Sequence, residues 1–151
     1  MNWLDVSEIN DMSCIFNMSN YNGDISRWNV SNVIDMNGMF ASSKFNNDIS
    51  NWDVSSVRNM SWMFFNSVFN GNISKWDVHN VTIMSDMFRN SQFNQDISGW
   101  DVSNVENMYI MFVDSPFNQD ISGWNVDKVT NYGRLFYNCP ILDSYKPKRF
   151  M

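Results

Sequence analysis

The chain repeats the same pattern of residues every 24 positions, and this period constrains its fold more than any other feature. Columns of Val, Ile, Met and Phe keep the 24-residue step with no insertion between Leu4 and Ile141. A repeat of roughly 20–50 residues indicates a solenoid, a propeller or another array. A step of 24 is too short for paired helices or a propeller blade, so we expect stacked coils that share one core. The clearest column is Trp28, Trp52, Trp76, Trp100 and Trp124.

The period also predicts how each coil is built. Trp52 and Val54 alternate with polar residues, which is typical of a short strand over 51–55. From position 57 to 64, Val, Met and Phe recur at steps of three and four, which is typical of a helical turn with one inward face. Asp48-Ile49-Ser50 fits a strand equally well, and both strands are compatible with one coil joined by a corner.

The predicted fold class is therefore an α/β repeat. We expect a leucine-rich-repeat-like, right-handed solenoid of about six coils, with short parallel strands on one face and short helical turns on the other. One domain spans 1–145, with coils that start near residues 4, 28, 52, 76, 100 and 124, and a basic C-terminal tail follows at 146–151.

The repeat resembles the BspA-like leucine-rich repeats, also known from Mycoplasma surface lipoproteins. The resemblance covers residues 4–141 and depends on F-N-Q-D-I-S-G-W-D-V-S-N-V at 93–105 and on M-x-x-M-F blocks such as 60–64. It implies a non-enzymatic surface or interaction protein, of a kind found in bacteria, some protists and large DNA viruses. The expected roles are a structural component of a virus particle or, alternatively, a bacterial or protist surface adhesin.

Residues suited to catalysis are sparse. His79 is the only histidine and stands in a column otherwise filled mainly by serine. Cys14 and Cys139 lie five coils apart, or roughly 24 Å at the spacing of adjacent strands, which is beyond the reach of a disulfide. No metal-ligand spacing and no phosphate-binding loop is present in the sequence. We therefore expect no enzyme, no cofactor and no metal site.

The acidic residues form ladders along the predicted stack. We expect these carboxylates mainly to bind turn amides, while a calcium site or an acidic docking face is a weaker alternative. Stacked Asn, Ser and Asp side chains are also compatible with a glycan-binding or ice-binding surface. The candidate acidic ladder is Asp5, Asp53, Asp77 and Asp101.

Departures from the repeat consensus point to a candidate interaction patch. Trp62 and Phe65 flank the inward Met63 and Phe64, and Ile110 and Val113 hold the same positions two coils later. On a helical turn these pairs lie on the outer face, where adjacent apolar side chains mark contact surfaces.

Charge and hydropathy restrict the partners and the location. The chain has 16 acidic and 10 basic residues, and three of the basic ones lie in the tail, so we expect no nucleic acid partner for the solenoid. No run reaches the roughly 18 apolar residues of a membrane span, and the first residues lack the pattern of a signal peptide. We expect a protein partner or neighbouring subunits, in a virion or at a cell surface.

Overall fold

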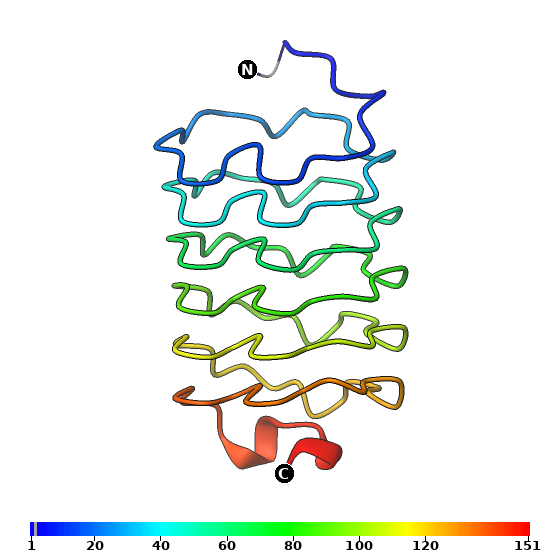
Figure 1. Ribbon diagram of the computed structural model, residues 1–151, viewed down its shortest axis with the longest axis vertical. Coiled ribbons are helices and arrows are strands. Elements are labelled where there is room, and N and C mark those ends of the chain that lie inside the picture. Colours follow the sequence, from blue (N-terminus) through cyan, green and yellow to red (C-terminus); the bar gives the residue numbers. More distant parts are fainter. Residues whose placement is uncertain (2) are drawn as a thin grey trace.

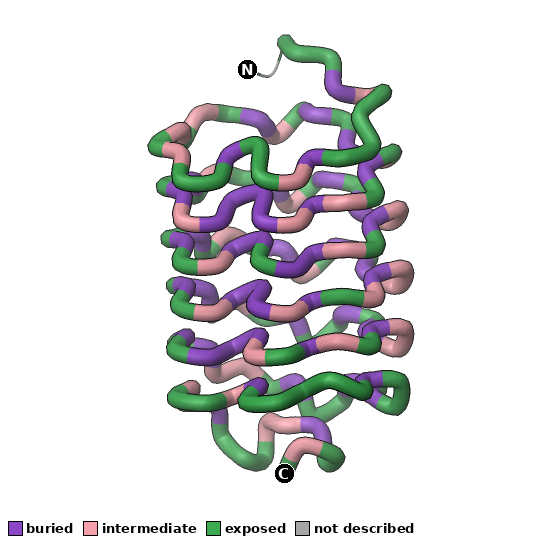
Figure 2. Tube along the Cα trace, in the orientation of Figure 1, coloured by how far each residue is buried: buried purple, intermediate pink, exposed green. Residues whose placement is uncertain are grey.

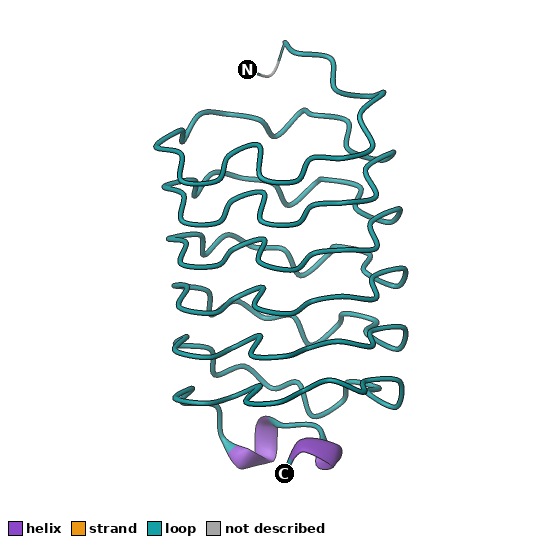
Figure 3. Cartoon of the chain, in the orientation of Figure 1, coloured by secondary structure: helices purple, strands orange, loops and turns teal. Residues whose placement is uncertain are grey.

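The computed structural model describes residues 1 and 3–151, and it shows the chain wound into stacked coils along its longest axis (Figure 1). The two termini lie at opposite ends of the stack. The regular elements of the described residues are two short 3₁₀ helices, η1 (Asp143–Tyr145) and η2 (Lys148–Phe150), both at the C-terminal end. The coils themselves consist of turns and extended segments (Figure 3).

Backbone hydrogen bonds between adjacent coils replace the predicted helical turns. The N–H groups of Met60, Trp62, Phe64 and Asn66 donate to the carbonyls of Ile83, Ser85, Met87 and Arg89, at 2.9–3.0 Å. The N–H groups of the intervening Met63 and Phe65 donate three residues back, to Met60 and Trp62. This segment is a series of β-turns because every second N–H group points to the next coil, where an α-helix would direct it along its own axis. Apolar residues spaced by three and four fit both arrangements.

The alternating segment at 51–55 also differs from the predicted strand. Trp52 and Val54 are buried at 4% and 1% exposure and Asp53 is exposed, so the side chains alternate as expected. The described backbone nevertheless forms no strand there or at 48–50, because turns at Trp52 and Val57 bend the chain on both sides. The parallel bridges lie elsewhere, once per coil, in the column Asp11, Asp35, Asn59, Ile83, Asn107 and Asn131.

Stacked aromatic rings fill the interior, so that buried residues recur at the same places in each coil (Figure 2). Six phenylalanines from Phe16 to Phe136 stack with centroids 5.5–5.8 Å apart. A second column, from Phe45 to Phe117, stacks at 6.3–6.5 Å. Each coil buries its apolar residues only by sharing them with its neighbours, as stacked repeats do.

Side chains add two further links between coils. The indole N–H of Trp76 donates to the carbonyl of Ile49 in the preceding coil at 3.0 Å, and the other repeat tryptophans do the same. An asparagine ladder runs along the outside, in which the Oδ1 atom of Asn70 accepts the backbone N–H of Asn94 at 2.9 Å. This ladder extends from Asn22 to Leu142.

The C-terminal tail packs against the last coil. The Phe150 ring lies 4.9 Å from the Tyr132 ring, and the Arg149 guanidinium donates to the carbonyls of Val126 and Asp127 at 2.8 Å. The tail therefore covers part of the end of the core.

We expect Asn70→Ala to lower the free energy of unfolding by about 0.5–1.5 kcal/mol, because the N–H of Asn94 loses its acceptor. Asn70→Asp keeps an oxygen at that position and should retain most of the stability. Chemical denaturation of both variants, with Gln92→Ala as an exposed control on the same return segment, measures the difference. Equal stability of Asn70→Ala and the control would contradict the role of the ladder.

Candidate functional site

One face of the stack carries the two columns in which the repeats differ most, and we call these columns the variable strip. The strip consists of the positions occupied by Trp62 and Phe65 in the third coil and their equivalents. Trp62 and Phe65 are joined by a β-turn hydrogen bond of 3.0 Å, and their rings meet edge to face at 4.7 Å. The structure thus brings the predicted pair together, on a turn instead of a helix.

A hollow of about 360 Å³ lies beside this pair, and we call it the Trp62 groove. Its floor is formed by Gly38 and Ala41, which hold the two strip positions in the second coil. Trp62 and Phe65 form one wall, and Cys14 and other residues of the first coil form the opposite side. The hollow exists because two small residues stand between coils with larger side chains.

The second predicted pair contributes less surface than expected. Val113 is only 7% exposed and Ile110 is half-buried, so Val113 is not part of an exposed patch. Both line a smaller hollow of about 320 Å³ that also involves Arg89, Arg134 and Tyr137. On a turn, the second strip position lies closer to the neighbouring coils than it would on the outer face of a helix.

An ion pair separates the two hollows. Asp86 is buried at 3% exposure, and the Arg89 guanidinium donates to its Oδ1 at 3.2 Å. The same guanidinium lies 5.5 Å from the centre of the Phe65 ring. Burial raises the pKa of Asp86, and the Arg89 hydrogen bond and charge oppose that shift. This pair was not predicted from the sequence, although acidic and basic residues three positions apart in the strip were a usable signal.

The first strip column has left-handed backbone throughout. Trp62 has φ 61° and Ile110 has φ 48°, a region that costs roughly 1–2 kcal/mol for residues with a Cβ atom. The sequence signals for this conformation in the column are Gly38, at φ 58°, and Asp86, at φ 57°. Bulky residues here are held by the inter-coil ladder, because their own N–H groups donate to the next coil.

The carboxylates of the acidic ladder hydrogen-bond to the backbone of turns. The Oδ1 atoms of Asp5, Asp53, Asp77 and Asp101 each accept the backbone N–H two residues later, at 3.0–3.2 Å. Bonds from Ser103 lower the pKa of Asp101 and, in the parallel Asp column, bonds from Ser50 lower the pKa of Asp48. Repulsion by Asp24 raises the pKa of Asp48 but is the smallest of its causes. Hydrogen bonding therefore outweighs like-charge repulsion along the ladders.

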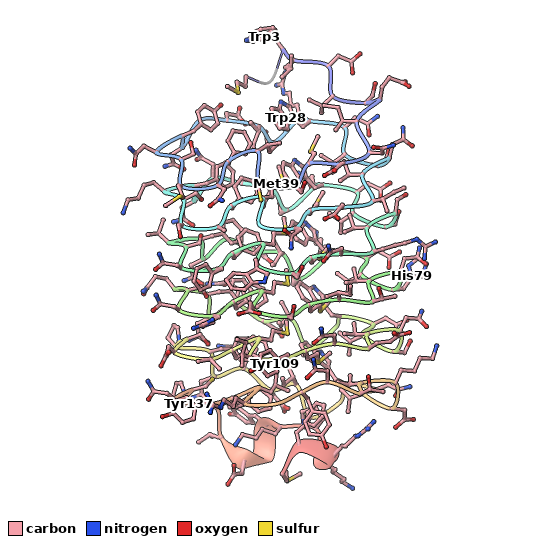
Figure 4. The ribbon with its side chains drawn as sticks, in the orientation of Figure 1. Trp3, Trp28, Met39, His79, Tyr109 and Tyr137 are labelled. Atoms are coloured by element: carbon pink, nitrogen blue, oxygen red, sulfur yellow. The ribbon has the colours of Figure 1, made fainter. Side chains whose placement is uncertain are left out.

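The remaining reactive side chains do not assemble into a site. The ring of His79 lies on the opposite side of the stack from Tyr137 (Figure 4), with its Nδ1 atom 2.7 Å from Asp77 Oδ1. Cys14 is exposed and Cys139 is half-buried, and burial raises the pKa of the Cys139 thiol. Within residues 1 and 3–151, no three His, Cys, Asp or Glu side chains are grouped as metal ligands. No helix among these residues is long and apolar enough to cross a membrane.

The Asx turns should make stability depend on acidic pH. The folded-state pKa values of Asp48, Asp96 and Asp120 are lowered, so the unfolded chain takes up protons first as the pH falls below about 4. The contribution of these carboxylates to the free energy of unfolding is fully present above about pH 4. It is lost as the pH falls through their lower folded-state pKa values.

We expect the Asp48→Asn, Asp96→Asn, Asp120→Asn triple variant to lose less stability between pH 5 and pH 2 than the unmodified chain. Asn72 already holds the same turn in this column, so the triple variant should fold. Urea denaturation at each pH measures the slope, and an unchanged slope would show that these carboxylates do not control it.

Arg89→Met should lower the free energy of unfolding by about 1–3 kcal/mol, because Asp86 is left buried without its partner. Adding Asp86→Gly should restore much of the loss, since Gly38 occupies the same left-handed position. Arg58→Met, at an exposed arginine outside the strip, is the matched control. A double variant no more stable than Arg89→Met would rule out the unpaired carboxylate as the cause.

Comparison with known families gives one result. The chain matches the family described as Mycoplasma protein of unknown function, DUF285, over residues 1–91 and again over 65–146. No curated protein and no solved structure matches it. The two matches together span nearly all of the repeat, so the chain belongs to the DUF285 family of repeat proteins.

Proposed function

We propose that this chain is a non-enzymatic interaction module that binds a protein partner in the Trp62 groove. The observation that carries the proposal is the groove itself: a mostly apolar hollow with an aromatic wall on an otherwise regular repeat surface. Trp62 is 38% exposed although its position costs backbone strain. Aromatic anchors packed against hollows are typical of the residues that dominate protein interfaces.

The dimensions and chemistry of the groove favour an apolar side chain as the inserted group. The lining residues carry no formal charge, and their polar side-chain groups are two amides, a hydroxyl, a thiol and the indole N–H of Trp62. A volume of about 360 Å³ lies near the lower end of small-ligand pockets. We infer that an aromatic or branched aliphatic residue of the partner enters between Trp62 and the first coil.

The ladders are less suited to ligand binding. The Oδ1 atoms of the asparagine ladder accept backbone N–H groups, and those of the acidic ladder hold Asx turns. These oxygens are already used by the fold, which favours the groove over a glycan-binding or ice-binding surface on the ladders.

The wider setting follows from the family resemblance and is part of the proposal. We infer that the stack is a BspA-like, leucine-rich-repeat-type solenoid. We infer that it serves in a larger assembly, such as the particle of a large DNA virus, or alternatively as a surface adhesin of a bacterium or protist.

Selection from a displayed peptide library tests the groove. The unmodified chain is the target, and Ala41→Phe is the counter-target, because a Phe at this position has a precedent in Phe65 and fills the groove floor. Enriched peptides should share an aromatic or branched aliphatic residue. They should lose at least about tenfold in affinity with Trp62→Ala and with Ala41→Phe.

Ile34→Ala, which removes an exposed apolar side chain outside the groove, should leave the affinity unchanged. Circular dichroism and denaturation midpoints verify that each variant is folded. Peptides that bind Ala41→Phe as well as the unmodified chain would overturn the proposal.

A further inference from the structure

Most peptide groups of the inter-coil ladder point the same way along the stack. In each of the first five coils, four N–H groups donate toward the C-terminal end, as those of Met12, Cys14, Phe16 and Met18 do, while one position per interface, such as Ile34 with its N–H on the carbonyl of Asn10, donates the other way. The matching carbonyls point toward the N-terminal end and accept from the preceding coil. Five successive interfaces repeat this set of four bonds at 2.7–3.2 Å. The stack is therefore polar, with different backbone groups at its two ends.

Both ends of the ladder are left unpaired. At the N-terminal end, the carbonyls of the first row have no hydrogen-bond partner among the described residues; they belong to Asp11, Ser13, Ile15 and Asn17. At the C-terminal end, four N–H groups are equally without an acceptor in that part of the chain; they belong to Tyr132, Arg134, Phe136 and Asn138. The two rows are complementary in chemistry and have the spacing already used inside the stack.

The charges of the two ends are also complementary. Asp5, Glu8 and Asp11 precede the first basic side chain, Arg27. Residues 124–151 carry five basic side chains against two acidic ones, Asp127 and Asp143, and Lys146 is paired with Asp143 at 2.7 Å. Exposed apolar side chains accompany both rows, with Met18 78% exposed at one end and Tyr137 65% exposed at the other.

We propose that a second copy of this chain docks head to tail and continues the ladder. The carbonyl row of the second copy's first coil lies next to the N–H row of the first copy's last coil. The N–H of Arg134 then donates to the carbonyl of Ser13 of the second copy. The other three pairs follow in the same register. A head-to-tail contact does not close on two copies, so it generates a linear series.

The tail makes this docking conditional. Tyr145 stands six repeats after Met1, so residues 145–151 occupy the register that the first seven residues of a docking copy would take. Either the tail or those first residues must move aside. The tail is held by the Phe150–Tyr132 ring contact and two bonds from Arg149, and their loss offsets part of the ladder energy. The tail contacts therefore weaken the association of the two copies.

A register-specific disulfide tests the proposal on the full chain. In the Cys139→Ser background, Arg134→Cys places a thiol one coil above Cys14 of the docked copy. Adjacent coils about 4.8 Å apart fall within the Cα separations of roughly 4.4–6.8 Å that disulfides span. The two positions are five coils apart within one copy, so an internal bond is out of reach. Diamide supplies the two-electron oxidation.

The expected result is a ladder of covalent oligomers on non-reducing gels, with a peptide that links position 134 to Cys14 found by mass spectrometry. Cys14→Ser in the same chain should abolish it. Gly123→Cys is the matched control, because this exposed position just before the last coil has open space around it and lies off the row. Oligomers no more abundant than those of the Gly123→Cys control would overturn the proposal, as would links that avoid Cys14.

Discussion

The ladder of backbone hydrogen bonds between coils is the constraint on which the rest of the structure depends. Every second N–H group in the turn segment donates to the next coil. The backbone must therefore adopt left-handed φ angles at fixed positions. Each bond contributes only about 0.5–1.5 kcal/mol net, but an unpaired buried group costs more, so the four-bond set forms or fails together. The turns, the left-handed residues and the position of the variable strip all follow from it.

The aromatic core is a consequence of that ladder. Because the ladder fixes the distance between coils, identical residues in successive coils meet at one repeating separation. The phenylalanine columns stack nearly parallel for this reason, with Phe64 and Phe88 inclined by only 5°. A leucine in the Trp column, as at Leu4, lacks the indole N–H that links other coils to their predecessors.

Much of the arrangement could be predicted from the period alone. Trp52, Met60 and Phe64 and their equivalents in the inner coils are buried where the repeat places them, and Trp62 is exposed beside Phe65. Local backbone could not be predicted, because apolar steps of three and four fit a helix and a series of β-turns equally well. Gly38 and Asp86 were the sequence signals for the left-handed backbone of the first strip column.

The features that the sequence could not supply are those that depend on adjacent coils. One example is Val113, which neighbouring coils bury. The others are two contacts between residues of different turns or coils: Arg89 with the ring of Phe65, and Phe150 with Tyr132. The Trp62 groove exists because the second coil has no large side chain at the strip positions, where Gly38 and Ala41 form the floor. A column-by-column comparison of residue sizes is the sequence signal closest to it.

The shared direction of the peptide groups has a mechanical consequence. A force applied between the two ends of the stack acts along the ladder bonds, so all four rungs of one interface bear the load together. The indole and asparagine links lie in parallel with them and share that load. Extension should therefore proceed by parting whole coils, one interface at a time, and each release would add the same length of 24 residues to the stretched chain.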